Sequence, residues 1–232
     1  MAEQMSLFDF TRPLYRIDKP IRLIELFAGY GSQAMALERL GANFETYKVV
    51  EFDKYAIASY NAVHHTNFPM IDICDVHGKD LEIKDKDKYE YIMVYSFPCT
   101  DISIAGLLGG MEEDSRTRSS LLWEVKRILL ELKELDALPQ IMLMENVPAI
   151  TSPVNYPHYR KWMDILHDLG YSSYNQMLNA ADYGVAQNRE RQFLLSILGD
   201  YNYNFVFSIQ VCLHHSVSPI DHELSGFLQL TA

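Results

Sequence analysis

The chain has 232 residues, of which 48% are hydrophobic and 12% aromatic, and this composition argues against a largely disordered protein. No apolar run approaches the roughly eighteen residues of a membrane span, and Met1–Met5 does not begin a signal peptide, so we expect a cytoplasmic protein with no membrane partner. The formal net charge of −11 is unusual for a protein that binds nucleic acid, although a local basic cleft can coexist with it.

Apolar segments typical of strands alternate with amphipathic segments typical of helices. The expected strands are 21–27, 46–50, 70–73, 91–95, 141–144, 172–178 and 192–198. The expected helices are 32–40, 54–63, 118–135 and 157–169. This alternation predicts an α/β fold with a Rossmann-like, doubly wound and mostly parallel sheet. We assign residues 21–200 to this domain, 1–20 to an N-terminal extension and 201–232 to a tail of unknown structure.

Glycines and acids follow the first three expected strands. Gly29 and Gly31 lie in the turn after the first strand, where a missing side chain lets the backbone approach a ligand closely. Glu51 closes the second strand, where an acid can accept hydrogen bonds from ribose hydroxyls. Phe52 is placed to cover an adenine ring, and Asp72 to meet its amino group. Each has a plain alternative as a core aromatic or surface acid, but their order favours an adenosine-containing cofactor.

A thiol and a carboxylic acid each follow an apolar strand. Cys99 comes after Pro98 and the strand at 91–95, and Glu145 follows the strand at 141–144. If these strands are neighbours in a parallel sheet, both side chains lie at its carboxyl edge, where ligands bind. The pair suits an enzyme that attacks a ring carbon with sulfur while a carboxyl group holds a ring nitrogen. Each residue has a plain alternative: Cys99 as a core thiol after a buried strand, and Glu145 as a helix-capping acid.

The remaining cysteines and histidines indicate neither a disulfide nor a metal. Cys74, Cys99 and Cys212 form no CxxC pair, so we expect thiols in a reducing compartment. His214 and His215 are adjacent but have no third ligand, so we predict no metal site.

Together these motifs resemble those of the cytosine-5 DNA methyltransferases, in the family's order, from Ile21 to Leu198. The matching segments are the cofactor loop at 27–31, the nucleophile motif at 97–99, part of the mobile catalytic loop at 113–116, the base-holding motif at 145–147 and the QxRxR segment at 187–191. The resemblance implies S-adenosylmethionine as cofactor and the sheet typical of methyltransferases that use it. The implied cofactor-binding residues are Phe27, Gly29, Gly31, Glu51, Phe52, Asp72 and Pro98.

The resemblance also implies methyl transfer to carbon 5 of cytosine in DNA, with restriction-modification as a setting. The thiolate of Cys99 would add to carbon 6 of a base flipped out of the duplex. Glu145 would hold a proton at ring nitrogen 3, because burial favours a protonated carboxyl group. Arg191 would contact the base carbonyl and Arg189 would help to fix the site. Read from the residues alone, these two arginines could instead form a surface ion-pair cluster around Glu190.

Only 34 residues follow Leu198, fewer than the family's DNA-reading domain and final segment require. We therefore expect that target recognition is missing from this chain, which is then one subunit of a split enzyme whose second polypeptide carries that region, or else a truncated gene product. Two other functions stay open. One is a tRNA cytosine-5 methyltransferase, whose motifs are nearly the same, and the other is a non-catalytic, truncated module that retains only cofactor binding.

Overall fold

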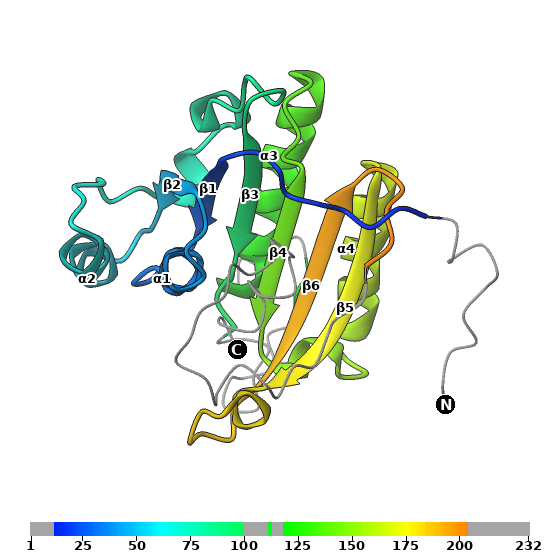
Figure 1. The fold of residues 1–232 in the computed structure, drawn as a ribbon. Helices are drawn as coiled ribbons and strands as arrows, with labels where there is room; N and C mark the ends of the chain where they lie inside the picture. Colours follow the sequence, from blue (N-terminus) through cyan, green and yellow to red (C-terminus); the bar gives the residue numbers. More distant parts are fainter. Residues whose placement is uncertain (1–11, 100–110, 113–117, 204–232) are drawn as a thin grey trace.

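The computed structural model describes residues 12–99, 111–112 and 118–203 (Figure 1). The strands of this part are β1 (Ile21–Leu26), β2 (Phe44–Val50), β3 (Glu90–Tyr95), β4 (Ile141–Asn146), β5 (Tyr171–Asn179) and β6 (Glu190–Leu198). Its α-helices are α1 (Ser32–Arg39), α2 (Lys54–His64), α3 (Leu122–Glu134) and α4 (Tyr156–Asp168). The strands form one sheet in the order β2-β1-β3-β4-β6-β5.

The sheet confirms the predicted Rossmann-like, mostly parallel architecture. β1 pairs in parallel with β2 and β3, and β3 pairs in parallel with β4. β6 runs antiparallel to both of its neighbours, β4 and β5. The reversal follows from the short connection 180–189, because two parallel strands need a crossover of about a dozen residues or more, usually through a helix.

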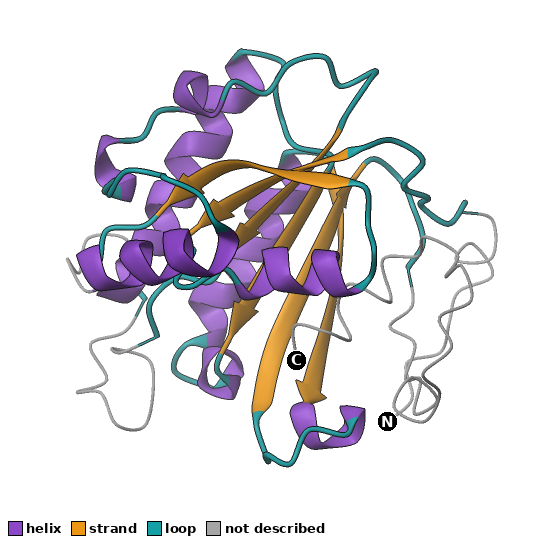
Figure 2. Cartoon of the chain, turned by 60° about the vertical axis from the view of Figure 1, so that its left-hand side comes forward, coloured by secondary structure: helices purple, strands orange, loops and turns teal. Residues whose placement is uncertain are grey.

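Helices cover both faces of the sheet (Figure 2). On one face, α3 and α4 pack against a core that includes Ile24, Met93 and Met144. On the other face, α1 packs against alternate strand residues such as Leu23 and Ile92. The central strands are buried on both sides, which explains why their sequences are nearly continuous apolar runs.

The strand expected at 70–73 is wrong. The chain there enters a 3-10 turn, Ile73–Asp75, and the Asp72 carboxylate caps it by accepting the Cys74 backbone N–H at 2.9 Å. The carbonyl groups of Ile73 and Val76 accept hydrogen bonds from the Arg127 guanidinium of α3, at 3.3 and 2.8 Å. The apolar run at 70–73 therefore reflects burial of Ile73 in the core, and its backbone is bound to a helix instead of the sheet.

Glu131 of α3 anchors the following turn, Gly78–Leu81. Its carboxylate accepts the Gly78 N–H at 2.6 Å and pairs with Arg127 at 2.9 Å and with the His77 ring at 3.2 Å. Partial burial raises the pKa of Glu131, but these hydrogen bonds outweigh burial and lower the pKa to about 2. A side chain at Gly78 would meet α3 backbone atoms at 3.0 Å, so glycine permits this close approach.

A buried carboxyl group joins β1 to two helices beneath the turn that follows the strand. Glu25 is only 1% exposed and accepts a hydrogen bond from the Tyr60 hydroxyl of α2. Burial raises the pKa of Glu25 to about 7, although hydrogen bonds from Tyr60 and the Ala34 backbone act in the opposite direction. Glu25 is therefore a buried acid that is neutral below about pH 7 in the folded protein.

We predict that Glu25→Gln removes a pH dependence of stability. The pKa of Glu25 is raised on folding, so its contribution is fully present below about pH 4.5 and is lost as the pH rises to about 7. Over that window the free energy of unfolding should fall by up to about 1.4 kcal/mol per pH unit in the wild-type chain. Urea unfolding at pH 5 and pH 8 should show that, between these two values, the free energy of unfolding falls less in the variant than in the wild-type chain. Parallel pH profiles would contradict a neutral buried Glu25.

Candidate active site

The carboxyl ends of β1, β3 and β4 lie at one edge of the sheet, together with the amino end of the antiparallel β6. Tyr95 of β3 pairs with Met144 of β4, so the two strands expected to be neighbours are neighbours. Ser96 and Glu145 directly follow this pair. Across the sheet, Glu145 pairs with Phe193 of β6. Three features therefore lie at this edge: the segment that leads to the Cys99 thiol, the Glu145 carboxyl group and the first residues of β6.

Glu145 and Arg191 form an ion pair at this edge. The distance from Arg191 Nε to Glu145 Oε1 is 2.8 Å, and the two side chains are only 18% and 21% exposed. Arg191 Nη1 also donates to the Glu190 carbonyl at 2.7 Å, which fixes the guanidinium. A pair this far withdrawn from water interacts more strongly than a surface pair. The partner of Arg191 is thus Glu145, a contact between residues 46 positions apart that the sequence pattern did not identify.

Cys99 is a half-buried free thiol that packs against the core on the α3–α4 face. It follows Phe97, which is buried, and Pro98, which is half-buried. The sulfur therefore lies neither deep in the core nor fully in solvent.

Glycine is suited to the two positions after β1, Gly29 and Gly31, for different reasons. Gly29 has a φ of 58°, and a Cβ there would meet nothing within 4 Å, so open space lies in front of it. Gly31 has a φ of 82°, but a Cβ there would lie 2.2 Å from the His64 ring and 2.6 Å from Tyr60. The packing of α2 therefore requires Gly31, whereas only Gly29 leaves room for a ligand.

A fixed carboxylate and an exposed aromatic ring lie beside this turn. The Glu51 carboxylate accepts the backbone N–H groups of Gly29 and Asp53, each at 2.8 Å. Each of its oxygens keeps a further lone pair for a hydroxyl donor. Phe52 is 67% exposed, and Asp72 follows a residue whose N–H donates to the Glu51 carbonyl at 2.9 Å. A ligand with neighbouring hydroxyl groups and a flat ring fits these residues.

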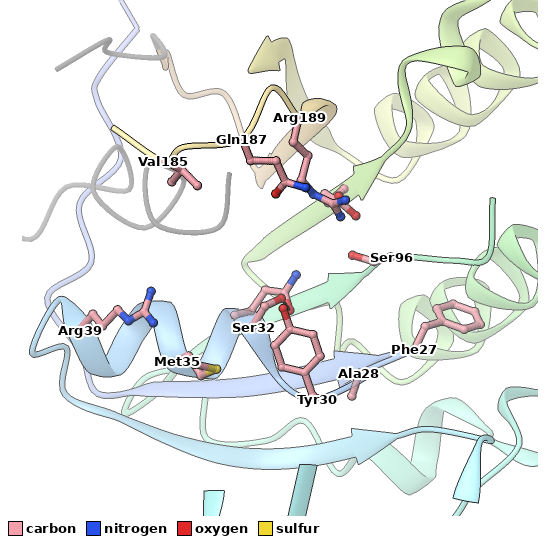
Figure 3. A pocket seen from close by; sticks show the side chains of 13 residues that line it. Phe27, Ala28, Tyr30, Ser32, Met35, Arg39, Ser96, Val185, Gln187 and Arg189 are labelled. Carbon is pink, nitrogen blue, oxygen red and sulfur yellow. Dashed lines mark hydrogen bonds between the residues drawn. The ribbon is translucent and has the colours of Figure 1, made fainter. Parts of the chain in front are cut away.

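A cavity of about 450 Å³ opens between the glycine turn and the connection from β5 to β6. In Figure 3, Gln187 and Arg189 extend from that connection toward Ser96 and the turn. The predicted site residues that line the cavity are Phe27, Gly29, Glu145 and Arg189. Those outside its lining are Gly31, Glu51, Phe52, Asp72, Pro98, Cys99 and Arg191. The cavity thus links the glycine turn to the Glu145 end of β4.

Sequence reasoning missed several polar residues of this lining, and Ser96 and Tyr30 are two of them. Ser96 directly follows β3 and obeys the same strand-end rule that identified Glu145, so that rule was sufficient to find it. Tyr30 is exposed and lies between Gly29 and Gly31, in the turn that the sequence had already assigned to a ligand.

Several sequence-based expectations fall outside the described residues. These are the catalytic-loop segment 113–116, Cys212, His214 and His215. Within the described part of the chain, no three His, Cys, Asp or Glu side chains cluster in a way that would hold a metal ion. The helices of that part are also too short or too polar to cross a membrane.

Comparison with curated proteins identifies methyltransferases as relatives. The type II methyltransferase M2.ScrFI of Lactococcus lactis subsp. cremoris is 30% identical, over 81% of this chain and 63% of its own length. The orphan methyltransferase M.SssI of Spiroplasma monobiae is 32% identical, over 79% of this chain and 61% of its own length. The type II methyltransferase M.HhaI of Haemophilus parahaemolyticus is 36% identical, over 81% of this chain and 52% of its own length. The chain therefore spans about half to three-fifths of the relatives it matches.

Solved structures share the fold. The S. pombe Dnmt2 methyltransferase has a TM-score of 0.58 at 21% identity, covering 82% of this chain and 52% of that chain. The Entamoeba histolytica methyltransferase EhMeth has a TM-score of 0.66 at 18% identity, covering 83% of this chain and 57% of that chain. At these identities the likeness shows the fold alone, which is that of S-adenosylmethionine-dependent methyltransferases. The family model described as C-5 cytosine-specific DNA methylase matches residues 21–225, and this chain belongs to that family.

Proposed function

We propose that this chain transfers a methyl group from S-adenosylmethionine to carbon 5 of cytosine in DNA, through a covalent adduct with Cys99. The observation that carries the proposal is the pairing of β3 with β4, because it brings the segment with Cys99 and the Glu145–Arg191 ion pair to one edge of the sheet. Membership of the family supports the reaction type. The relatives are longer than this chain, so the substrate is argued from the site.

The residues around the glycine turn suit the cofactor. Bound S-adenosylmethionine would supply an electrophilic methyl group at this edge of the sheet. We assign the ribose hydroxyls to the fixed carboxylate of Glu51, the adenine ring to Phe52 and the adenine amino group to Asp72. Gly29 permits close approach of the ligand, and Phe27 and Pro98 flank it. Gly31 contributes indirectly, by letting the turn pass close to Tyr60 and His64.

Cys99 is the proposed nucleophile. Its thiolate forms a bond to carbon 6 of the cytosine ring, and the electron pair of the carbon 5–carbon 6 double bond moves into the ring. Carbon 5 thereby becomes nucleophilic enough to take the methyl group. Loss of the carbon 5 proton to a base restores the double bond and expels the sulfur as thiolate. Sulfur suits both steps, because it is strongly nucleophilic near neutral pH and also leaves readily.

Glu145 and its partner hold the base during this addition. Electron density moves toward ring nitrogen 3 when sulfur adds, and we assign to the Glu145 carboxyl group the proton that it shares with that nitrogen in a hydrogen bond. Arg191 orients this carboxyl group through the ion pair and is assigned to the base carbonyl. Arg189, which lines the cavity opposite Ser96, helps to fix the base. The arginines thus have different roles, one inside the ion pair and one on the cavity wall.

DNA recognition requires more than this edge. A cytosine inside a duplex is inaccessible, so the target base must be flipped into the site. The formal net charge of −11 opposes the phosphate backbone, and sequence readout needs side chains placed in a groove. We propose that a second polypeptide supplies that readout.

We predict that Cys99→Ser abolishes methyl transfer and leaves cofactor binding almost unchanged, because the thiol is needed only for attack on the ring. Transfer of tritiated methyl groups to duplex DNA should be measured with protein in excess over DNA, since the chain without a recognition partner is expected to be slow. Cys74→Ser is the matched control and should retain the wild-type rate. Retained transfer in Cys99→Ser would refute the nucleophile, and transfer to tRNA but not DNA would reassign the substrate.

Glu51→Ala should weaken S-adenosylmethionine binding by about 1–3 kcal/mol, because the ribose hydroxyls lose a charged acceptor. Titration calorimetry measures this loss directly. Glu38→Ala, which removes an exposed acid from α1, serves as the control and should leave the affinity unchanged. Equal affinities of the Glu51 variant and the wild-type chain would show that Glu51 only holds the Gly29 and Asp53 backbone.

A further inference from the structure

The peptide carbonyls of the two residues before Cys99 are held by side chains from different elements. The Phe97 carbonyl accepts a hydrogen bond from Asn146 Nδ2 at 3.2 Å, and the Pro98 carbonyl accepts one from Ser119 Oγ at 2.9 Å. Asn146 is 3% exposed and Ser119 is 0% exposed, so water does not compete for these donors. Because proline fixes its own φ and has no N–H, the carbonyl contacts largely set the direction in which the chain enters Cys99.

Asn146 connects this backbone to the proposed base-holding acid. It directly follows Glu145 at the end of β4, and its Oδ1 accepts the Val147 N–H at 2.8 Å. Both polar atoms of the Asn146 side-chain amide are therefore hydrogen-bonded, Oδ1 to the Val147 N–H and Nδ2 to the Phe97 carbonyl. The end of β4 thus holds the peptide two residues before Cys99.

Ser119 connects the same backbone to α3. It lies in the 3-10 turn Arg118–Leu121, which runs directly into that helix. Four residues further on, the Trp123 indole N–H donates to the Met111 carbonyl at 2.8 Å. The start of α3 therefore holds the chain just before Cys99, at Pro98, and again at Met111. A buried serine in this place is bonded to the one peptide whose orientation most directly places the sulfur.

We propose that Ser119 is a positioning residue for Cys99, and that its hydroxyl orients the peptide carrying the nucleophilic sulfur. The inference rests on the proposed function of Cys99, but the position of the thiol can be measured without turnover. A reacting atom displaced by about 1 Å can cost roughly 100-fold in rate, so a single hydrogen bond at this peptide has a large effect on chemistry. A purely structural serine would affect stability alone.

The test measures the reactivity of the Cys99 thiol in a chain whose other cysteines are replaced, with Cys74→Ser and Cys212→Ser. In that background, Ser119→Ala should raise the second-order rate of alkylation by iodoacetamide at least about three-fold, because the half-buried sulfur is no longer held against the core. Ser196→Ala is the matched control: Ser196, on β6, is also 0% exposed, and its hydroxyl lies 2.7 Å from that of Ser173, on β5. It should lose stability without changing the alkylation rate.

Two further measurements make the outcome decisive. Ser119→Gly removes the same hydroxyl and replaces the alanine variant if that variant does not unfold cooperatively. In the methyl-transfer assay, the Ser119 variant should lose rate with no change in cofactor affinity. Wild-type alkylation rates in both Ser119 variants would overturn the positioning role. If the wild-type chain reacts with iodoacetamide but methylates no DNA, the proposed function is contradicted. The comparison of alkylation rates still decides the role of Ser119 in that case.

Discussion

Ile92–Tyr95 of β3 pair in register with Ile141–Met144 of β4, and the proposed catalytic groups take their positions from this pairing. Parallel strands end at the same edge, so the segment leading to Cys99 and the acid at Glu145 emerge side by side. The strands can hold this register because both are buried on both faces, where a slip by one residue would exchange the helix-facing side chains. The paired central strands of the sheet therefore determine the positions of residues in the connections that follow them.

The antiparallel direction of β6 is the second requirement. A parallel β6 would begin at the opposite edge of the sheet, more than about 20 Å from Glu145. Because β6 is reversed, its first residues lie where β4 ends, and Arg191 forms its ion pair with Glu145 at 2.8 Å. Removing one partner of such a withdrawn pair would leave the other charge poorly compensated. The short connection that forces the reversal also supplies Gln187 and Arg189 to the cavity.

Periodicity in the sequence predicted most of the fold because it reports burial, and burial is nearly continuous in β1, β3 and β4. It failed at 70–73, where Ile73 is buried but its carbonyl, like that of Val76, accepts a hydrogen bond from Arg127, more than 50 positions away. Strand ends located Cys99 and Glu145, whereas the Glu145–Arg191 and Ser119–Pro98 contacts depend on how distant segments meet. At Gly31, which was predicted for the cofactor turn, the structure shows a separate requirement for glycine, because a side chain there would clash with His64 and Tyr60 of α2.

The central claim is that the Cys99 sulfur bonds to a cytosine held at this edge, and a trapped adduct tests it most directly. A duplex that carries 5-fluorocytosine, incubated with the chain and S-adenosylmethionine, blocks the last step because fluorine cannot leave carbon 5 as a proton does. Peptide mass spectrometry should then find the methylated base attached to the peptide that contains Cys99. An adduct on Cys74, or no adduct at all while the chain binds S-adenosylmethionine, would contradict the account.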